Sequence, residues 1–322
     1  MALYLTEADV EKALSMKDAI EVVEAAMREW GSGGGTNNPR ARVEIDDRVL
    51  NVLTAGVQSI HSFGLKAYTT FSDGTRGTSF LILVYDSQTG NLDALVQAGN
   101  ITRIRTGAAT AVATKYLARK KDTPVLGIIG AGRIGELQVS ALMESRRFER
   151  VLVYDFVKEG AERMVAKVRE KYSADCVEAR SSAEIAKKSD IIVTATSSEK
   201  PVISGKDLRP GLHLNAVGSN SAKRAEVDEE CFSRASLIVV DHKAQCILEA
   251  GDLIRAVESK KVDWSDVLEL SHVVVHAREY TRRDEDITIF KSVGIAIEDV
   301  AVARWVAQRA AGLGLGIQVS VS

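Results

Sequence analysis

The most constraining feature of the sequence is a glycine-rich turn that follows a short apolar run. The glycines of this turn, spaced G-x-G-x-x-G, are Gly130, Gly132 and Gly135. The run before them, Val125–Ile129, is typical of a buried parallel strand. The first glycine permits a tight turn, the second lets the backbone approach a pyrophosphate, and the third lets helix and strand pack closely. Arg133 and Ile134 open the helix expected next, whose first amide groups would receive the phosphates.

The segment after the turn completes a recognisable unit. Residues 133–147 carry apolar side chains at helical spacing, and a second apolar run, Val151–Tyr154, ends at Asp155, about twenty residues beyond Gly135. A carboxylate there can accept hydrogen bonds from both ribose hydroxyls and would repel a 2′-phosphate, which favours NAD over NADP, although a nearby arginine could accommodate NADP. A turn that binds no nucleotide is the alternative. The complete order of strand, glycines, helix, strand and acid favours the nucleotide.

Composition excludes several other classes of protein. The chain has 322 residues, enough for two domains, with 45% hydrophobic and 27% charged residues and a net charge of −2, so neither nucleic acid nor a membrane is an expected partner. The acidic N-terminus does not resemble a signal peptide, and Cys176, Cys231 and Cys246 form no disulfide pattern, so we expect a cytoplasmic protein. His272 and His276 lack the glutamate of a zinc motif, and no metal site is expected.

The segments on either side of the glycine turn differ in pattern. Before it we expect a helix over residues 16–30 and then a mainly antiparallel sheet. The expected strands are residues 42–46, 49–53, 64–71, 78–85 and 92–97. The first of them alternates Val43 and Ile45 with acids, as a half-buried strand does. After the turn, strands and helices alternate, and the closing helix, which contains Ile297 and Val306, is expected to return to the N-terminal domain.

Two groups of polar residues are candidates for ligand binding. Arg103 and Arg105 lie near the start of an alanine-rich helix over residues 100–120, where a guanidinium makes a good anion receptor; a solvated arginine is the alternative. Other polar or glycine-containing stretches follow the strands after Asp155, at the sheet edge where open α/β sheets bind ligands. They are Thr194–Ser198, which contains Thr196, and Gly218–Ser221, which contains Asn220. A polar loop with capping residues is the alternative around Thr196.

Four stretches resemble the ornithine cyclodeaminase/μ-crystallin family. They are RTGAATAVATKYLAR (Arg105–Arg119), the GAGRIG turn, HLNAVGSN (His213–Asn220) and DITIFKSVGIAIEDVAVA (Asp286–Ala303). The family includes ornithine cyclodeaminases, archaeal-type alanine dehydrogenases and ketimine or imine reductases. The resemblance covers nearly the whole chain in order. It implies an α/β fold in which residues 120–292 form a Rossmann NAD-binding domain and residues 1–119 with 293–322 form a substrate domain that dimerises through its sheets.

The resemblance also implies roles for particular residues. Arg40 (after Pro39), Lys66 (in FGLKAYTTF) and Arg105 would bind the substrate carboxylate. The expected cofactor contacts beyond the glycine turn and Asp155 are Thr78, Arg105, Thr106, Thr196, Val217, Gly218, Asn220 and Ser292. From spacing alone Lys66 would be an exposed strand lysine, and Arg42 would point the same way as Arg40, so the resemblance alone gives Lys66 and Arg40 these roles.

One departure from the family affects the expected activity. Cyclodeaminases and alanine dehydrogenases carry an aspartate acid/base after the V-G-x stretch, where this chain has Asn220. Asparagine cannot exchange a proton at neutral pH, which leaves Lys66 as the best proton donor and Asn220 as a group that orients the substrate nitrogen. The favoured function is an NAD-dependent amino-acid dehydrogenase or imine reductase for a small 2-oxo or 2-imino acid. The alternatives are cyclodeamination with bound NAD and a dinucleotide-binding protein without turnover.

Overall fold

The computed structural model describes residues 1–71, 79–280 and 282–321. The chain divides into two compact units: Met1–Ala109 with Ile295–Ser322, and Thr110–Gly294. The first boundary lies inside helix α3 (Gly99–Leu117), before the expected boundary at residue 119, because this helix is continuous and contributes to both units. The second lies after Gly294, close to the expected position after residue 292.

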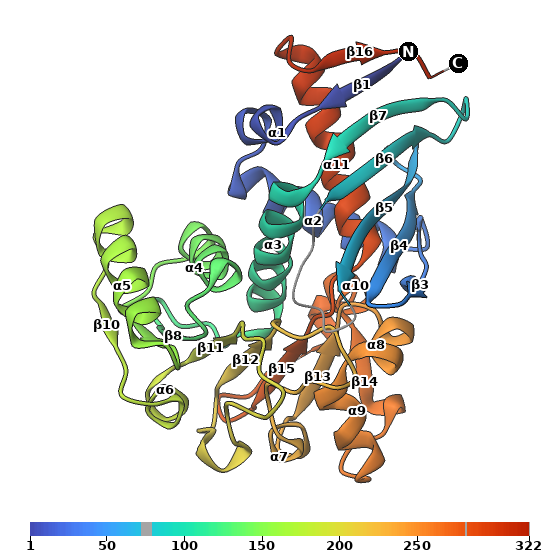
Figure 1. Cartoon of the computed structure of the whole chain (residues 1–322). Helices are drawn as coiled ribbons and strands as arrows, with labels where there is room; N and C mark the ends of the chain where they lie inside the picture. Colours follow the sequence, from blue (N-terminus) through green and yellow to red (C-terminus); the bar gives the residue numbers. More distant parts are fainter. Residues whose placement is uncertain (72–78, 281, 322) are drawn as a thin grey trace. The chain divides into compact units, whose positions relative to one another are not determined.

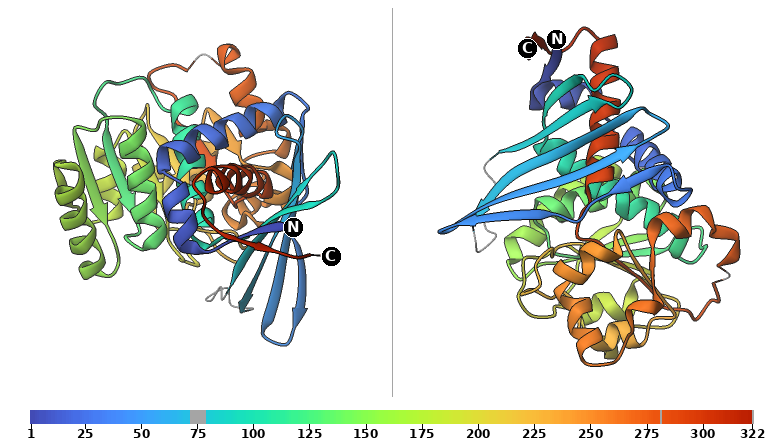
Figure 2. Two further views of the ribbon diagram at one scale, coloured as in Figure 1. Left: turned by 90° about the horizontal axis from the view of Figure 1, so that it is seen from above. Right: turned by 90° about the vertical axis from the view of Figure 1, so that its right-hand side faces the viewer.

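The first unit is built on an eight-stranded sheet, in the order β16-β1-β7-β6-β5-β4-β2 with β3 paired to β4. The strands are β1 (Ala2–Leu5), β2 (Gly35–Asn37), β3 (Ala41–Ile45), β4 (Arg48–Val57), β5 (Ser62–Phe71), β6 (Phe80–Asp86), β7 (Leu92–Gln97) and β16 (Ile317–Val319). β4 to β7 are antiparallel, as predicted. Strand β1 was not predicted. It lies parallel to β7 and antiparallel to β16, so both chain ends meet at one edge (Figure 2).

Three further helices belong to the first unit. Helices α1 (Glu7–Ala13) and α2 (Met16–Gly31) each begin with a capping box, in which Thr6 or Ser15 exchanges hydrogen bonds with an aspartate three residues later. Helix α11 (Ala296–Gly312) packs against β4, β5 and β6, and most of its residues are buried (Figure 1). Helix α11 therefore belongs to the same compact unit as the N-terminal residues.

Strand β3 differs from its prediction. Val43 and Ile45 are 58% and 68% exposed, and every residue of β3 is exposed, so the strand is not half-buried. The alternation in the sequence is present, but β3 pairs only with β4, off the main path of the sheet. Alternation predicts a strand; it does not show that something covers the apolar side.

The second unit is a doubly wound parallel sheet of eight strands in the order β10-β9-β8-β11-β12-β15-β13-β14. They are β8 (Val125–Ile129), β9 (Arg150–Tyr154), β10 (Cys176–Glu178), β11 (Ile191–Thr194), β12 (His213–Ala216), β13 (Leu237–Val240), β14 (Val267–Glu269) and β15 (Thr288–Lys291). The strand order reverses between β8 and β11, which are hydrogen-bonded neighbours. Such a switch point, at the carboxyl ends of the strands, is where open α/β sheets bind ligands.

Helices cover both faces of this sheet. They are α4 (Arg133–Ser145), α5 (Lys158–Tyr172), α6 (Ser182–Lys188), α7 (Glu229–Ser233), α8 (Lys243–Glu249), α9 (Gly251–Glu258) and α10 (Leu270–Val275), with short 3-10 turns at Gly205–Asp207, Trp264–Asp266 and Ala277–Glu279. Alternate strand residues point to opposite cores: Val193 packs with residues of α4 and α5, and Ile192 with residues of α6, α7 and α9. The predicted Rossmann-type fold is confirmed. No helix in the described ranges is long and apolar enough to cross a membrane.

Candidate functional site

The glycine turn of the second unit contains two glycines that the protein itself requires. Gly130 has φ of 103°, and a Cβ there would lie 2.6 Å from the carbonyl oxygen of Ala195. A Cβ at Gly135 would lie 2.0 Å from the carbonyl oxygen of Gly130, so only glycine lets α4 pack this closely on the end of β8.

At Gly132, the middle position of the turn, the protein fold itself does not require glycine. Gly132 has φ of −78°, which any residue adopts, and a Cβ built on it meets nothing within 4 Å. Gly132 is the N-cap of α4, and no side chain caps this end of the helix. Open space in front of uncapped amide groups fits a pyrophosphate, which needs close approach to the backbone and favours the positive end of the helix dipole. Arg133 is exposed and Ile134 half-buried at the same end.

Asp155 lies beside this turn, as the sequence predicts. Its Oδ2 accepts a hydrogen bond from the Ala131 amide and its Oδ1 one from the Val157 amide. The carboxylate is half-buried at the end of β9. It is thus fixed in place with part of its surface left for hydroxyl donors such as those of a ribose.

The loops after β11, β12 and β15 provide the other predicted cofactor residues. Thr196 and Gly218 are half-buried and both donate backbone hydrogen bonds to Glu226, whereas Asn220 is exposed. The Ser292 hydroxyl donates to Asp241, so it points into the protein. Asp241 also accepts hydrogen bonds from the backbone amides of Val293 and Gly294, and so holds the loop after β15 in place.

The first unit contains a buried cluster of charged side chains, which we call the cation cluster: Arg40, Lys66, Arg105, Glu298 and Asp299. Lys66, on β5, is only 2% exposed, and its Nζ lies 3.0 Å from Asp299 Oδ1. Arg105, on α3, is 4% exposed; its Nε lies 2.9 Å from the same oxygen and its Nη1 2.8 Å from Glu298 Oε2. The expectation from spacing, an exposed Lys66, is wrong.

The two carboxylates of the cation cluster lie in the first turn of α11. Both are fully buried. The positive end of the helix dipole favours negative charge there, and the buried cations supply the pairing that a buried carboxylate needs. Neither acid was predicted to belong to the site. The available signal was two adjacent acids inside the otherwise apolar pattern of residues 296–303.

Burial and neighbouring charges shift the protonation of Lys66. Burial, opposed by Asp299 but reinforced by the charges of Arg105 and Arg40, lowers its pKa from 10.5 to about 7. Strong perturbation of this kind by burial and specific charges is typical of functional groups. Lys66 can therefore gain or lose a proton near neutral pH.

Arg40 and Arg42 have different environments, although the sequence did not separate them. Arg40 precedes β3 and is 8% exposed, with its guanidinium 5.9 Å from the centre of the Tyr68 ring. Arg42 is exposed and donates to Asn51. Thr106 donates its hydroxyl to a backbone carbonyl in α3. Thr78 lies outside the described residues.

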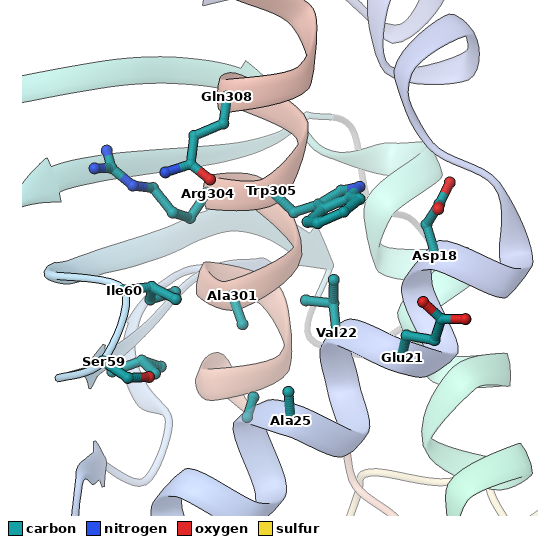
Figure 3. A pocket seen from close by; sticks show the side chains of 12 residues that line it. Asp18, Glu21, Val22, Ala25, Ser59, Ile60, Ala301, Arg304, Trp305 and Gln308 are labelled. Carbon is teal, nitrogen blue, oxygen red and sulfur yellow. The ribbon is translucent and has the colours of Figure 1, made fainter.

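A separate cavity of about 290 Å³ lies between α2 and α11 (Figure 3). Trp305 and Val22 lie on opposite sides of it, and no member of the cation cluster lines it. Arg304, on its rim, already pairs with Asp93 and Asp86. We assign no part of the candidate site to this cavity.

Comparison with known proteins identifies the family. The model of the ornithine cyclodeaminase/mu-crystallin family matches residues 2–313. The chain belongs to this family. Its members include the alanine dehydrogenase of Archaeoglobus fulgidus, which is 31% identical over 322 residues covering 98% of each chain.

Two solved structures of this family superpose closely. One is Δ1-pyrroline-2-carboxylate reductase of Thermococcus litoralis in complex with NADH and L-proline, with a TM-score of 0.91 and 34% identity over 98% of this chain and 100% of that one. The other is an archaeal alanine dehydrogenase dimer with bound NAD, with a TM-score of 0.92 and 30% identity over 100% and 99% of the two chains. The predicted family and fold are confirmed.

Proposed function

We propose that this protein is an NAD-dependent oxidoreductase that interconverts a small 2-imino or 2-oxo acid and the corresponding amino acid. The family supports this reaction class, because the similar proteins are an alanine dehydrogenase and an imine reductase. The observation that carries the proposal for this chain is the cation cluster, in which Lys66 is buried and has a pKa near 7.

The charge balance of the cation cluster suits a carboxylate substrate. Arg40, Lys66 and Arg105 can carry three positive charges, and Glu298 and Asp299 can carry two negative ones. When all five are charged, one positive charge is left over in a buried region. A monoanionic carboxylate balances it, and guanidinium groups offer paired donors that match carboxylate geometry.

The dinucleotide would be held by the glycine turn of the second unit. Gly132 and the first amide groups of α4 would take the pyrophosphate, and Asp155 would take the ribose hydroxyls. NAD, when bound, supplies or accepts the hydride. The carboxylate of Asp155 supports NAD rather than NADP, because a 2′-phosphate there would meet like charge.

Lys66 would move the proton that accompanies the hydride. Reduction of a C=N bond adds a hydride to carbon and a proton to nitrogen, and the charged lysine can donate that proton. The neutral lysine can accept it in the oxidative direction. Asn220 can orient the nitrogen through hydrogen bonds but cannot take over the proton transfer. We therefore expect reduction to be faster below about pH 7 and oxidation to be faster above it.

A substrate screen tests the proposal. The protein is incubated with NADH and either cyclic 2-imino acids or 2-oxo acids with ammonia or methylamine, and NADH absorbance is followed. Oxidation with at least one small substrate is expected. Tight NADH binding without turnover across the whole panel would overturn the proposal in favour of a dinucleotide-binding protein. Conversion of ornithine to proline and ammonia without net NADH change would instead indicate a cyclodeaminase.

We also propose that the protein is a cytoplasmic homodimer. The similar alanine dehydrogenase is a dimer. Val43, Ile45, Leu50 and Phe63 of the first unit are exposed apolar residues on or beside β3 and β4, as an uncovered interface would have. Cys176, Cys231 and Cys246 are free and buried, which suits a reducing compartment. Light scattering of the eluting protein tests the dimer, and a monomer at micromolar concentration would contradict it.

A further inference from the structure

A buried glutamate outside the assigned residues links the loops of the second unit. Glu226 is fully buried. Its Oε1 accepts the Thr196 amide at 2.6 Å and the Thr196 hydroxyl at 3.0 Å, and its Oε2 accepts the Gly218 amide at 2.6 Å. One carboxylate therefore joins the loop after β11 to the loop after β12.

The two loops are held so close together that no side chain fits between them. A Cβ at Gly218 would lie 2.3 Å from the Thr196 amide nitrogen and 2.4 Å from Glu226 Oε1. Gly218 has no positive φ that would by itself require glycine. Contact with Glu226 and Thr196 is thus the physical reason for glycine here.

A buried lysine supports this arrangement from the next strand. Lys291, at the end of β15, is fully buried, donates to the Ser219 carbonyl at 2.9 Å and lies 3.3 Å from Asp252 Oδ2. Burial alone would lower its pKa, but Asp252 and Glu226 raise it above the ordinary value, so the lysine stays charged. Burial raises the pKa of Glu226, and Lys291 opposes that shift. The ends of β11, β12 and β15 thus form one hydrogen-bonded and ionic group.

The position of these loops indicates which half of a dinucleotide they serve. The sheet order is β9-β8-β11-β12. Asp155, at the end of β9, would take the adenosine ribose, and the glycine turn after β8 would take the pyrophosphate. A dinucleotide that continues in the same direction along the carboxyl edge then has its nicotinamide half over the ends of β11 and β12.

We propose that Glu226 is a positioning residue that shapes the loops after β11 and β12 to receive the nicotinamide half of the cofactor. This inference rests on the proposed binding of NAD but adds a residue and a specific role. Its side chain is fully buried beneath these loops, which rules out a direct role at the surface. It acts through the backbone of Thr196 and Gly218, which only an acceptor with two oxygens can hold together.

The test compares two ligands that share the adenosine and pyrophosphate end. NADH and ADP are titrated against the wild type and Glu226→Gln. The glutamine keeps one acceptor oxygen and places an NH₂ group opposite the other amide, so one loop loses its partner. We expect NADH affinity to fall about tenfold or more while ADP affinity stays near that of the wild type.

The matched control is a substitution of another buried carboxylate, which lies at the amino ends of the strands of the same sheet. Asp190 is 5% exposed, precedes β11, and accepts the Val125 amide at 2.8 Å and Lys121 Nζ at 2.9 Å. Asp190→Asn should lower the melting temperature without changing the ratio of NADH to ADP affinity.

The titrations decide the inference as follows. An equal loss of NADH and ADP affinity in Glu226→Gln, or no loss of either, would overturn it. If that variant does not fold, Glu226→Asp keeps the charge but is too short to reach both loops, and the same selective loss is expected. Failure of the wild type to bind NADH would instead reject the proposed function, so the two failures can be told apart.

Discussion

The glycine turn of the second unit and the cation cluster of the first are both anion receptors, but they are built in opposite ways. The glycine turn offers backbone amides and open space at a helix N-terminus, and its residues lie within one short segment. The cation cluster uses charged side chains, and its Lys66–Asp299 pair joins residues 233 positions apart. One site can be read from local spacing, whereas the other exists only after folding.

The difference also affects the free-energy cost of each site and its response to pH. Backbone amides in the glycine turn have a fixed charge distribution, so their affinity for phosphate changes little with pH. Buried ions must be paired, and removing one partner of such a pair typically costs about 3–5 kcal/mol. In return, burial makes a lysine titratable near neutral pH, which a proton-transfer step requires. The first design suits holding a cofactor and the second suits chemistry.

The largest expected effect comes from removing the titratable group of the cation cluster. Lys66→Met should reduce turnover by about 10²–10⁴-fold, the usual contribution of general acid–base catalysis. NADH affinity should stay unchanged, because the glycine turn belongs to the other unit. Steady-state rates and NADH titration measure the two effects. Lys17→Met, on the exposed side of α2, is the control and should behave as wild type. Equal losses of turnover and NADH binding in Lys66→Met would contradict this division of labour.

The second effect separates the two kinds of glycine in the turn. Gly132→Ala adds a Cβ into open space, so the fold should keep its stability while NADH affinity falls about tenfold or more. Gly135→Ala places its Cβ 2.0 Å from a carbonyl oxygen and should destabilise the protein by about 1–3 kcal/mol or more. Thermal unfolding and NADH titration of both variants measure the contrast. If Gly132→Ala unfolds as readily as Gly135→Ala, the space at Gly132 is structural and does not serve a ligand.

The same contrast explains what could be predicted from the sequence. The order of strand, glycines, helix, strand and acid is local, so the Rossmann fold and the place of Asp155 followed from residue spacing. The resemblance to the family singled out Lys66, and the place of Arg105 near a helix start made it a candidate as well, but nothing local showed that either side chain is buried. Their burial depends on Glu298 and Asp299, which reach them only when α11 packs on the sheet.

Other differences have equally specific causes. β1 was missed because a strand of four residues is too short for a periodic pattern, and it is held by pairing with β7 and β16. Val43 and Ile45 were expected to be half-buried, but alternation does not reveal whether a partner covers a strand. Glu226 was missed because its role lies in backbone amides of two loops, and no side-chain motif marks such a contact.

A third prediction concerns the choice of cofactor at the glycine turn. Asp155→Ser removes the charge that would repel a 2′-phosphate, so the ratio of NADPH to NADH affinity should rise by about tenfold. Titration measures both affinities. Their ratio is compared because Asp155 also accepts a hydrogen bond from the Ala131 amide, so its loss can weaken binding of both cofactors. Asp175→Ser, an exposed carboxylate of the same unit, is the control and should leave the ratio unchanged. An unchanged ratio in Asp155→Ser would show that another group selects the cofactor.

The last prediction tests whether the cation cluster responds to pH while the glycine turn does not. The pKa of Lys66 is about 7 in the folded protein, below its ordinary value of 10.5, because burial disfavours the charged form. Between these values the unfolded chain binds more protons than the folded one, so this lysine makes stability rise with pH, by at most about 1.4 kcal/mol per pH unit. The contribution is complete above 10.5 and is lost as the pH falls through about 7. The free energy of unfolding is measured with urea for the wild type and Lys66→Met at about pH 7 and about pH 9. From the lower to the higher pH, the stability of the wild type should rise relative to that of the variant. Gly132→Ala leaves the cation cluster intact, so its difference in unfolding free energy from the wild type should not change with pH. If the difference for Lys66→Met is also independent of pH, Lys66 stays charged throughout this range.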